Sequence, residues 1–409
     1  MVTQQRDHAT LLGRPYDKCH RGQFMDHDER LAALRLHLTT GIGPRLFGAL
    51  SERFGSALAA TEASAAELAE IRGIGHDSAA KMRQAMAEAD PEAEFQKTQD
   101  AGVALLVRGQ PDYPIALTYL TDAPPVLYVK GAIVPEDAQA MAVVGMRKCS
   151  LYGQDQAERL AGGLARAGFT IVSGLARGID SAAHQAALAS GGRTIAVLGN
   201  GLSRVYPPEN KKLAEAVVAR GALVSEFAMD VREAPENFPR RNRIIAAFSL
   251  GVIVVEAGKQ SGSLITARLA AELGKEVFAV PNRVDAPGAA GVHALIRDGA
   301  KLVESVADVL DEFPDLGIAA PAESAADGLP RDGDAPAAPR QQTLGLKAAL
   351  SADETQLVTA MDGEPLGLDV LIQRSGLPSA KVSGALTMLE LKGFVRALPG
   401  GRFALRRKQ

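Results

Sequence analysis

Six short apolar runs, separated by segments of helical character, constrain the fold of this chain more than any other feature. The runs lie at residues 141–144, 170–173, 194–198, 223–226, 252–256 and 277–281. The helical segments lie at 153–166, 179–188, 208–219, 240–249 and 264–273. Apolar strands that alternate with helices are typical of a parallel sheet covered on both faces. The sequence therefore predicts an α/β fold with a Rossmann-like, doubly wound, mostly parallel sheet, whose ligand lies beyond the carboxyl ends of the strands.

Changes in composition divide the 409 residues into five predicted parts. Polar segments without periodicity predict a disordered tail and a flexible linker, whereas an Ala/Leu-rich helical pattern predicts a helical domain. Near the C-terminus, a helix-turn-helix pattern followed by a hairpin at 393–405 predicts a winged helix. The predicted parts are a disordered tail at 1–27, a helical domain at 28–100, the sheet domain at 101–314 with an extended connector at 103–131, a flexible linker at 315–346 and the winged helix at 347–409.

The helical domain carries the same tripeptide at two turns. Gly41-Ile42-Gly43 is followed by Pro44, which suits a first helical position, and the second copy is Gly73-Ile74-Gly75. A G-x-G turn that opens a helix exposes backbone N–H groups, as in a helix-hairpin-helix phosphate clamp. The turns fit tight connections within a small helical bundle equally well, so both alternatives stay open.

Charge and composition limit how the chain can hold a ligand. The formal net charge is -3, so a site for a polyanion must be a local concentration of positive charge. The chain has no Trp and 4% aromatic residues, which favours contact with phosphates over base stacking and predicts little sequence preference. Cys19 and Cys149 lack C-x-x-C spacing, which predicts a reducing compartment and no zinc site. No apolar run reaches the ~20 residues of a membrane span and no signal peptide is recognisable, so we expect a cytoplasmic protein without membrane insertion.

Residues that suit phosphate binding, most of them glycine or serine, follow four of the predicted strands. Glycines let backbone amides approach an anion closely, and the helix N-termini behind them add partial positive charge. Because the carboxyl ends of parallel strands share one edge of a sheet, we expect these loops to form a surface for several phosphates. Glycines in such turns can also serve close packing alone. The candidate positions are Gly145, Arg147, Ser173, Gly174, Arg177, Gly199, Gly201, Ser261, Gly262 and Ser263.

Three arginines within four residues open a predicted helix, in the run FPRRNR at 238–243. Like charges at a helix N-terminus repel each other and oppose the helix dipole, and a bound phosphate would compensate them. We therefore place Arg241, Asn242 and Arg243 in the site. We also expect at least one of the three arginines to pair with Glu226 or Glu256.

Single charged or titratable side chains add to the predicted sheet edge. Arg147, directly after the first strand, is the arginine best placed for a phosphate, and Lys211 adds to the site from the start of a helix. Asp180 and His184 stand four apart on one helix face, but a capping Asp and a packed His are the commoner reading of this spacing. No H-E-x-x-H, P-loop or G-x-S-x-G pattern occurs, so we expect no catalysis, no cofactor and no metal.

Several of these motifs recur together along the central segment. They are VVGMR from Val143, SGLARGIDSAAHQAAL from Ser173, GNGL from Gly199 leading to Tyr206-Pro207, Ser225-Glu226, FPRRNRII from Phe238, Val255-Glu256-Ala257, SGSLIT from Ser261 and GVHALIRDGAKLV from Gly291. This combination resembles one family, the DNA-processing protein A (DprA, also called Smf) of bacterial natural transformation. The resemblance extends over about residues 31–310, with a looser match in the predicted winged helix.

The resemblance implies a function and a set of sites. It implies a SAM-like fold for the helical domain, sequence-independent binding and protection of single-stranded DNA, a homodimer, and loading of the recombinase RecA. The family's strand-binding pocket falls on Arg147, the Ser173-Gly174 loop, the 199–201 loop, residues 241–243 and the 261–263 loop, and its dimer surface falls around His293 and Leu302. Two positions depart from the family pattern: Pro208 replaces a lysine, so that contact would pass to Lys211, and Asn282 replaces a glycine.

Two functions of other classes are kept as alternatives. One is a nucleotide-cleaving enzyme similar to the cytokinin-activating phosphoribohydrolases, whose P-G-G-x-G-T-x-x-E pattern carries a catalytic glutamate. Aligning its G-T on Gly262-Ser263 puts Thr266 in place of that glutamate, which counts against this alternative. The other is a duplex-binding regulator led by the winged helix. Its predicted recognition helix at 381–391 offers Lys381 and Ser383 but no arginine, which is little polar reach for reading bases.

Overall fold

The structure is a computed structural model, and it describes residues 27–316, 351–361, 366–391, 394–398 and 402–405. The chain divides into two compact units after Asp327, a point inside the predicted linker. The predicted tail at 1–27 lies outside the described residues except for His27, which begins a helix, and so does the predicted linker except for residues 315 and 316. Every helix in the described ranges is too short or too polar to span a bilayer.

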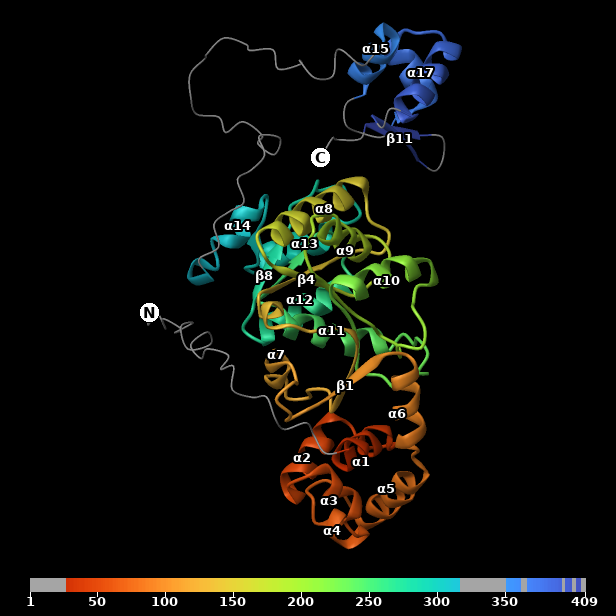
Figure 1. Cartoon of the computed structure of the whole chain (residues 1–409). Coiled ribbons are helices and arrows are strands. Elements are labelled where there is room, and N and C mark those ends of the chain that lie inside the picture. Colours follow the sequence, from red (N-terminus) through yellow and green to blue (C-terminus); the bar gives the residue numbers. More distant parts are fainter. Residues whose placement is uncertain (1–26, 317–350, 362–365, 392–393, 399–401, 406–409) are drawn as a thin grey trace, which may run out of the picture. The chain divides into compact units, whose positions relative to one another are not determined.

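The first unit begins with six helices (Figure 1). Side-chain caps start several of them: Ser56 accepts a hydrogen bond from the Ala59 amide, and Ser64 and Glu67 form a capping box. The two Gly-Ile-Gly turns join helices, and Gly41 and Gly73 have φ values of 93° and 96°, a conformation that favours glycine. The helices are α1 (His27–Leu38), α2 (Pro44–Phe54), α3 (Ala57–Glu62), α4 (Ala65–Ala69), α5 (His76–Glu88) and α6 (Pro91–Asp100).

A nine-stranded sheet follows, in the order β1-β2-β6-β5-β4-β3-β7-β8-β9. Neighbouring strands from β6 to β9 are parallel, whereas β1 pairs with β2 and β2 pairs with β6 in antiparallel fashion. This confirms the predicted doubly wound, mostly parallel sheet. The strands are β1 (Val103–Val107), β2 (Val126–Gly131), β3 (Ala140–Val144), β4 (Thr170–Ser173), β5 (Thr194–Val197), β6 (Ala222–Ser225), β7 (Gly251–Val254), β8 (Glu276–Ala279) and β9 (Lys301–Leu302).

The prediction of an extended connector at 103–131 is wrong. These residues supply β1, β2 and the short helix α7 (Ile115–Thr118) between them. The prolines that suggested a connector all lie between the two strands, at 111, 114, 124 and 125, where they interrupt no strand pairing. Both strands bury apolar side chains, so this segment extends the sheet instead of leading to it.

Helices cover both faces of the sheet (Figure 1). Along β3, Met141 and Val143 pack toward one face with α8 and α9, and Ala142 and Val144 pack toward the other with α11 and α12. β3 lies between β4 and β7, so the chain reverses its direction of winding at this point. The remaining helices of the unit are η2 (Pro135–Ala138), α8 (Leu151–Arg166), α9 (Ile179–Ala189), η3 (Pro208–Asn210), α10 (Lys211–Arg220), α11 (Asn237–Phe248), α12 (Ser263–Glu272), α13 (Ala289–Arg297), α14 (Val306–Leu310) and η4 (Pro314–Leu316).

The second unit is a winged helix, as predicted. A capping box of Ser351 and Glu354 starts α15, and Gly376, with a φ of 67°, ends α16. Within its described residues, three short strands pair antiparallel in the order β10-β12-β11. The elements are α15 (Ala352–Ala360), β10 (Leu366–Gly367), α16 (Leu368–Ser375), α17 (Ser379–Leu391), β11 (Val395–Leu398) and β12 (Arg402–Leu405).

Candidate nucleic-acid groove

Two adjoining hollows lie at the carboxyl ends of the strands and share Arg147, Tyr206 and Phe238. The larger has a volume of about 450 Å³, within the range of sites that hold small ligands. We call the two together the groove. Gly174, Ala176, Arg177, Pro207 and Arg241 complete the lining of one hollow, and Glu233, Ala234, Pro235, Pro239, Asn242, Gly262 and Ile265 complete that of the other. The structure thus brings together loops that follow β3, β4, β5, β6 and β7.

Arg147 stands at the centre of the groove because it lines both hollows. It lies in the loop between β3 and α8, and its side chain is exposed. Its guanidinium carbon lies 4.8 Å from the centre of the Phe238 ring, a cation–π contact that orients the group without neutralising it. An arginine held in this way keeps its N–H donors available to an anion.

Arg241 is buried in the wall of the same groove. Its Nη1 donates to the carbonyl oxygens of Gly174, at 2.8 Å, and Val197, and its Nε lies 3.3 Å from the Asn242 Oδ1. Burial lowers the pKa of Arg241 to about 10; the Asp180 carboxylate acts in the opposite direction, and the positive charge of Arg147 lowers it further. Arg241 is therefore still charged at neutral pH, and two guanidinium groups face one hollow.

Arg243 and Arg240 are instead directed to carboxylates. Arg243 is buried, and it pairs with Glu226 through Nη2 and with Asp122 through Nε at 3.3 Å. Arg240 lies 3.7 Å from the same Glu226 carboxylate and over the ring of Phe227. The expectation that one of the three arginines pairs with Glu226 is confirmed. These ion pairs give Arg243 a structural role, and it does not line the groove.

Arg177 and Lys211 lie toward the edge of the site. Arg177 lines the smaller hollow, but its Nε donates to the Glu209 carboxylate. Lys211 is exposed at the first residue of α10 and lines neither hollow. Both are therefore peripheral to the Arg147 and Arg241 pair.

The glycines of the groove serve mainly close packing. A Cβ on Gly174 would lie 2.4 Å from the Arg241 Nη1, and one on Gly201 would lie 2.0 Å from the Ala228 carbonyl oxygen. The Gly174 amide donates to Asp180 at 3.1 Å and the Gly201 amide to the Val231 carbonyl at 2.9 Å. The expectation that these two amides face a phosphate is therefore wrong, because internal acceptors already take their protons. Gly145 and Gly199 are crowded in the same way, by Ile179 and Phe238.

The serines of the predicted loops differ from one another. Ser173 is fully buried, and its hydroxyl donates to the Val143 carbonyl at 2.6 Å, so it braces neighbouring strands. The hydroxyls of Ser261 and Ser263 lie 2.8 Å apart at the start of α12, beside Gly262 in the groove lining. Nothing lies within 4 Å of a Cβ added to Gly262, which leaves this helix start open.

Asp180 and His184 lie behind the groove. Asp180 accepts hydrogen bonds from the Gly174 and Ala176 amides, and burial raises its pKa. His184 is fully buried, with its Nδ1 2.6 Å from the Thr194 hydroxyl, and burial lowers its pKa to about 3. Both side chains thus serve the packing of α9, in agreement with the structural reading of their spacing.

Two aromatic residues in the groove were not among the predicted site residues. The Tyr206 and Phe238 rings lie 6.0 Å apart, centre to centre, and both line both hollows. The low aromatic content argued against stacking, but two rings at one place are enough to contact bases. A usable signal was present, since each ring precedes a proline in a segment that follows a strand.

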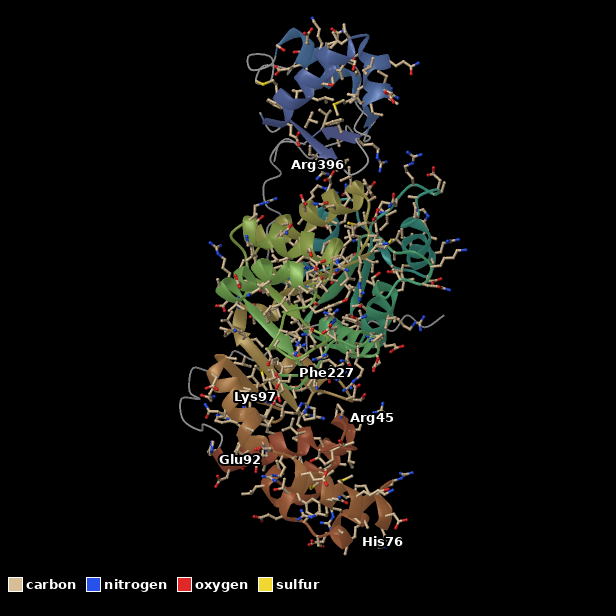
Figure 2. The ribbon with its side chains drawn as sticks, turned by 90° about the vertical axis from the view of Figure 1, so that its right-hand side faces the viewer. Arg45, His76, Glu92, Lys97, Phe227 and Arg396 are labelled. Atoms are coloured by element: carbon tan, nitrogen blue, oxygen red, sulfur yellow. The ribbon has the colours of Figure 1, made fainter. Side chains whose placement is uncertain are left out.

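The loop after β6 forms the side of the groove that carries Glu233, Ala234 and Pro235. It is held from the helical part of the unit: the Glu94 carboxylate accepts the Met229 amide at 2.6 Å, and Lys97 pairs with Asp230 at 2.6 Å. Phe227 and Lys97 mark this junction in Figure 2. The helical part therefore positions one wall of the groove.

His293 and Leu302 lie outside the groove, near the β9 edge of the sheet. His293 is half-buried on α13, with its Nε2 2.8 Å from the Asn282 carbonyl oxygen. Leu302 belongs to the edge strand β9 and is 42% exposed, which leaves an apolar side chain at the sheet edge. Asn282, the departure from the family pattern, donates from Nδ2 to Glu256 at 3.1 Å.

Comparison with known proteins shows the family. The model of DNA recombination-mediator protein A matches residues 104–314, just over half of the chain, and models of a DprA-like N-terminal HHH domain and a DprA winged helix domain match 27–91 and 335–401. The chain belongs to the DprA/Smf family. Protein Smf of Escherichia coli strain K12 is 43% identical to this family member over 300 residues, which cover 72% of this chain and 75% of the relative.

Two further relatives extend the similarity of this DprA/Smf protein. Protein Smf of Synechocystis is 33% identical over 401 residues, which cover 93% of this chain and 100% of the relative. The X-ray structure of DNA processing protein A from Streptococcus pneumoniae superposes with a TM-score of 0.61 at 35% identity, over 71% of this chain and 99% of that one. The DprA/Smf fold thus accounts for the helical part and the sheet together.

Proposed function

We propose that this DprA/Smf protein binds single-stranded DNA in the groove without regard to sequence. Arg147 and Arg241 would contact phosphates, with Arg177 and Lys211 at the periphery, and Tyr206 and Phe238 would contact bases. The observation that carries the proposal is the pair of guanidinium groups at one hollow, where each positive charge disfavours the other. A phosphate between them relieves that repulsion, and arginine suits phosphate geometry.

Contact with the phosphate backbone of the strand explains why the base sequence of the DNA would matter little. Phosphates are the same at every position, and every base has a face that stacks on an aromatic ring. Single strands are favoured over duplex because the rings can reach only unpaired, flexible bases. The acidic net charge of the chain is no obstacle, because the positive charge needed is local.

The proposal includes no chemical step on the strand. Asp180 and His184 are engaged within the protein, and Thr266, which would stand in place of a phosphoribohydrolase glutamate, is buried in α12. Incubation with nucleoside monophosphates tests this part: release of free base at a rate above a buffer control would contradict it.

We infer a homodimer in the cytoplasm that joins through the surface of His293 and the exposed Leu302, protects incoming DNA and loads RecA onto it. We also infer that the chain is divided into domains at the predicted boundaries. Sedimentation of a Leu302→Arg variant tests the dimer. If the dimer forms through this surface, the variant should sediment as a smaller species than the parent protein.

The binding experiment uses Arg147→Ala and the full chain. Affinity for oligothymidine and for a mixed-sequence strand should both fall by about tenfold, because a charge-assisted contact is lost. The slope of log affinity against log salt should flatten by about 0.7, the value per phosphate contact on a single strand. Arg220→Ala is the matched control, since Arg220 is also exposed but ends α10 at the amino end of β6. An unchanged slope for Arg147→Ala, or equal loss in both variants, would contradict the proposal.

A further inference from the structure

Glu256 is a buried carboxylate that lies beside the groove but does not line it. It follows β7, is 2% exposed, and lies at the N-terminus of α8, next to the point where the winding of the sheet reverses. In many folds of this kind that helix N-terminus receives an anion from the ligand. Here the anion is supplied by the chain itself: Glu256 Oε2 accepts the Ser150 amide at 2.8 Å, and Oε1 accepts the Ser150 hydroxyl.

The surrounding sequence leaves room for this carboxylate. A Cβ on Gly153 would lie 2.4 Å from the Glu256 Cδ, and one on Gly288 would lie 3.1 Å from the same group. Any larger residue at Gly153 would push Glu256 out of its place. The two glycines therefore serve to seat one side chain.

The bond to Ser150 bears directly on Arg147. Both residues lie in the six-residue loop from Gly145 to Ser150 between β3 and α8. At one end of the loop the Met146 carbonyl accepts the Ile179 amide at 3.3 Å, and at the other end Ser150 is held by Glu256. Within the described part of the chain, the Arg147 guanidinium packs on the Phe238 ring and forms no ion pair or side-chain hydrogen bond, so its place depends on how the ends of its loop are held.

Glu256 also joins this loop to the far side of the sheet. Asn282, after β8, donates from Nδ2 to Glu256 Oε1 at 3.1 Å, and its carbonyl oxygen lies 2.8 Å from the His293 Nε2 on α13. A continuous set of hydrogen bonds thus runs from α13 through Asn282 and Glu256 to Ser150. The Glu256 carboxylate thus accepts hydrogen bonds from the Ser150 amide, the Ser150 hydroxyl and the Asn282 side-chain amide at the N-terminus of α8, where the helix dipole favours negative charge.

We propose that Glu256 is a positioning residue for DNA binding, which holds the loop of Arg147 in the form that meets a phosphate. The inference rests on the proposed function, because it assigns Glu256 an effect only through Arg147. Electrostatics alone predicts the opposite result, since removing a negative charge near a polyanion site should strengthen binding. The sign of the change therefore separates positioning from charge.

The test measures affinity for oligothymidine in a double-mutant cycle on the full chain. Glu256→Gln keeps the shape but places an N–H₂ group against the Ser150 donors; it should weaken binding by about tenfold, as Arg147→Ala does, and the double variant should be no more than about twofold weaker than either. Glu272→Gln makes the same charge change at the exposed end of α12 and should leave affinity unchanged or slightly higher. Ser150→Ala keeps the carboxylate but removes one of its donors, together with the side-chain cap that accepts the Gly153 amide at 3.0 Å; it should weaken binding in the same direction and also be non-additive with Arg147→Ala.

The outcomes distinguish a failure of the positioning role of Glu256 from a failure of the proposed function. Additive losses, or tighter binding by Glu256→Gln, overturn the positioning role while Arg147 keeps its own effect. If Arg147→Ala binds as the parent protein does, the proposed function fails first and the positioning role falls with it. Should Glu256→Gln not fold, judged by its circular dichroism and thermal unfolding, the Ser150→Ala cycle decides the question alone by the same criteria.

Discussion

Two arginines of the groove act from opposite situations. Arg147 is exposed and rests on a ring, whereas Arg241 is buried and donates to two backbone carbonyls, one in the loop after β4 and one at the last residue of β5. Removing an exposed arginine costs little folding free energy, but removing a buried one leaves its acceptors unpaired. The two residues can therefore be distinguished by stability as well as by binding.

Arg241→Ala should both weaken strand binding and lower the free energy of unfolding by about 2–4 kcal/mol. The Gly174 and Val197 carbonyls would lose their donor, and the buried Asp180 would lose the positive charge of Arg241, which favours its ionised form. Urea unfolding of Arg241→Ala and Arg147→Ala, beside the parent protein, measures the difference. Equal stability of the two variants would show that Arg241 is not buried as described.

The free energy of unfolding should decrease as the pH is lowered, because of His184. Burial lowers its pKa from 6.5 to about 3, so the folded protein keeps the ring neutral while the unfolded chain takes up a proton below pH 6.5. The unfolded state then binds more protons, and the free energy of unfolding decreases as pH falls from about 6.5 toward 3. Between pH 7 and pH 5 this one residue accounts for about 2 kcal/mol. His37, whose pKa is lowered to about 4 by burial and by Arg240, acts in the same direction.

Comparing His184→Gln with the parent protein isolates this effect. The variant should be less stable at pH 7, because it loses the fitted imidazole, but the gap should narrow at pH 5. Urea midpoints at the two pH values measure it. A gap that stays constant would mean that His184 titrates normally in the folded protein.

At the residue scale, the position of the site side chains in the fold was easier to predict from the sequence than their contacts. Arg147, Gly174, Arg241 and Gly262 could be assigned to one edge because each follows a strand of a parallel sheet. The pairing of Arg243 could not be predicted in full, since Asp122 lies in a segment that was interpreted as a connector. Tyr206 and Phe238 were missed because overall composition says nothing about where rings converge.

At the scale of elements, the loops of the groove are held by their own packing. Gly178, directly before α9, has a φ of 73°, and a Cβ there would lie 2.4 Å from the Met146 carbonyl oxygen. The loop after β4 thus supports the loop that carries Arg147. Gly262, at the start of α12, lines the same groove but has free space around it.

These two glycines should respond differently to substitution by alanine. Gly178→Ala should lower the free energy of unfolding by about 1–3 kcal/mol, because the backbone conformation is strained for alanine and the added methyl group meets a carbonyl oxygen. It should also weaken strand binding, since the Met146-Arg147 backbone must move. Gly262→Ala should leave stability within about 0.5 kcal/mol. Thermal unfolding of both variants checks this, and equal behaviour would contradict the described packing.

The elements themselves were predictable to different degrees. Buried parallel strands such as β4 and β5 read as short apolar runs and were found within about one residue of their ends. β1 and β2 were missed because the connection between them, which contains α7, holds all the prolines of the segment. The composition of the whole segment therefore concealed the two strands at its ends. The helix α11 begins at Asn237, before the arginines, so these lie in its first turns and not at its cap.

For the whole molecule, the proposed function brings an acidic chain together with a polyanionic ligand. The net charge of -3 would oppose binding over the surface at large, so affinity must come from the groove, where Arg147 and Arg241 meet two aromatic rings. The rival surfaces are the Gly-Ile-Gly turns of the helical part and α17 of the winged helix, whose Lys381 pairs with Asp353 at 3.1 Å. Locating the strand on the protein separates these three sites.

The central claim is tested most directly by photo-crosslinking the full chain to an oligothymidine that carries 4-thiothymidine, followed by peptide mapping. We expect the linked residues to be Tyr206, Phe238 and their immediate neighbours, with yields that fall as salt is raised and that drop sharply in Arg147→Ala. Crosslinks confined to residues 379–391 or to the turns at 41–43 and 73–75, and unaffected by Arg147→Ala, would contradict the account.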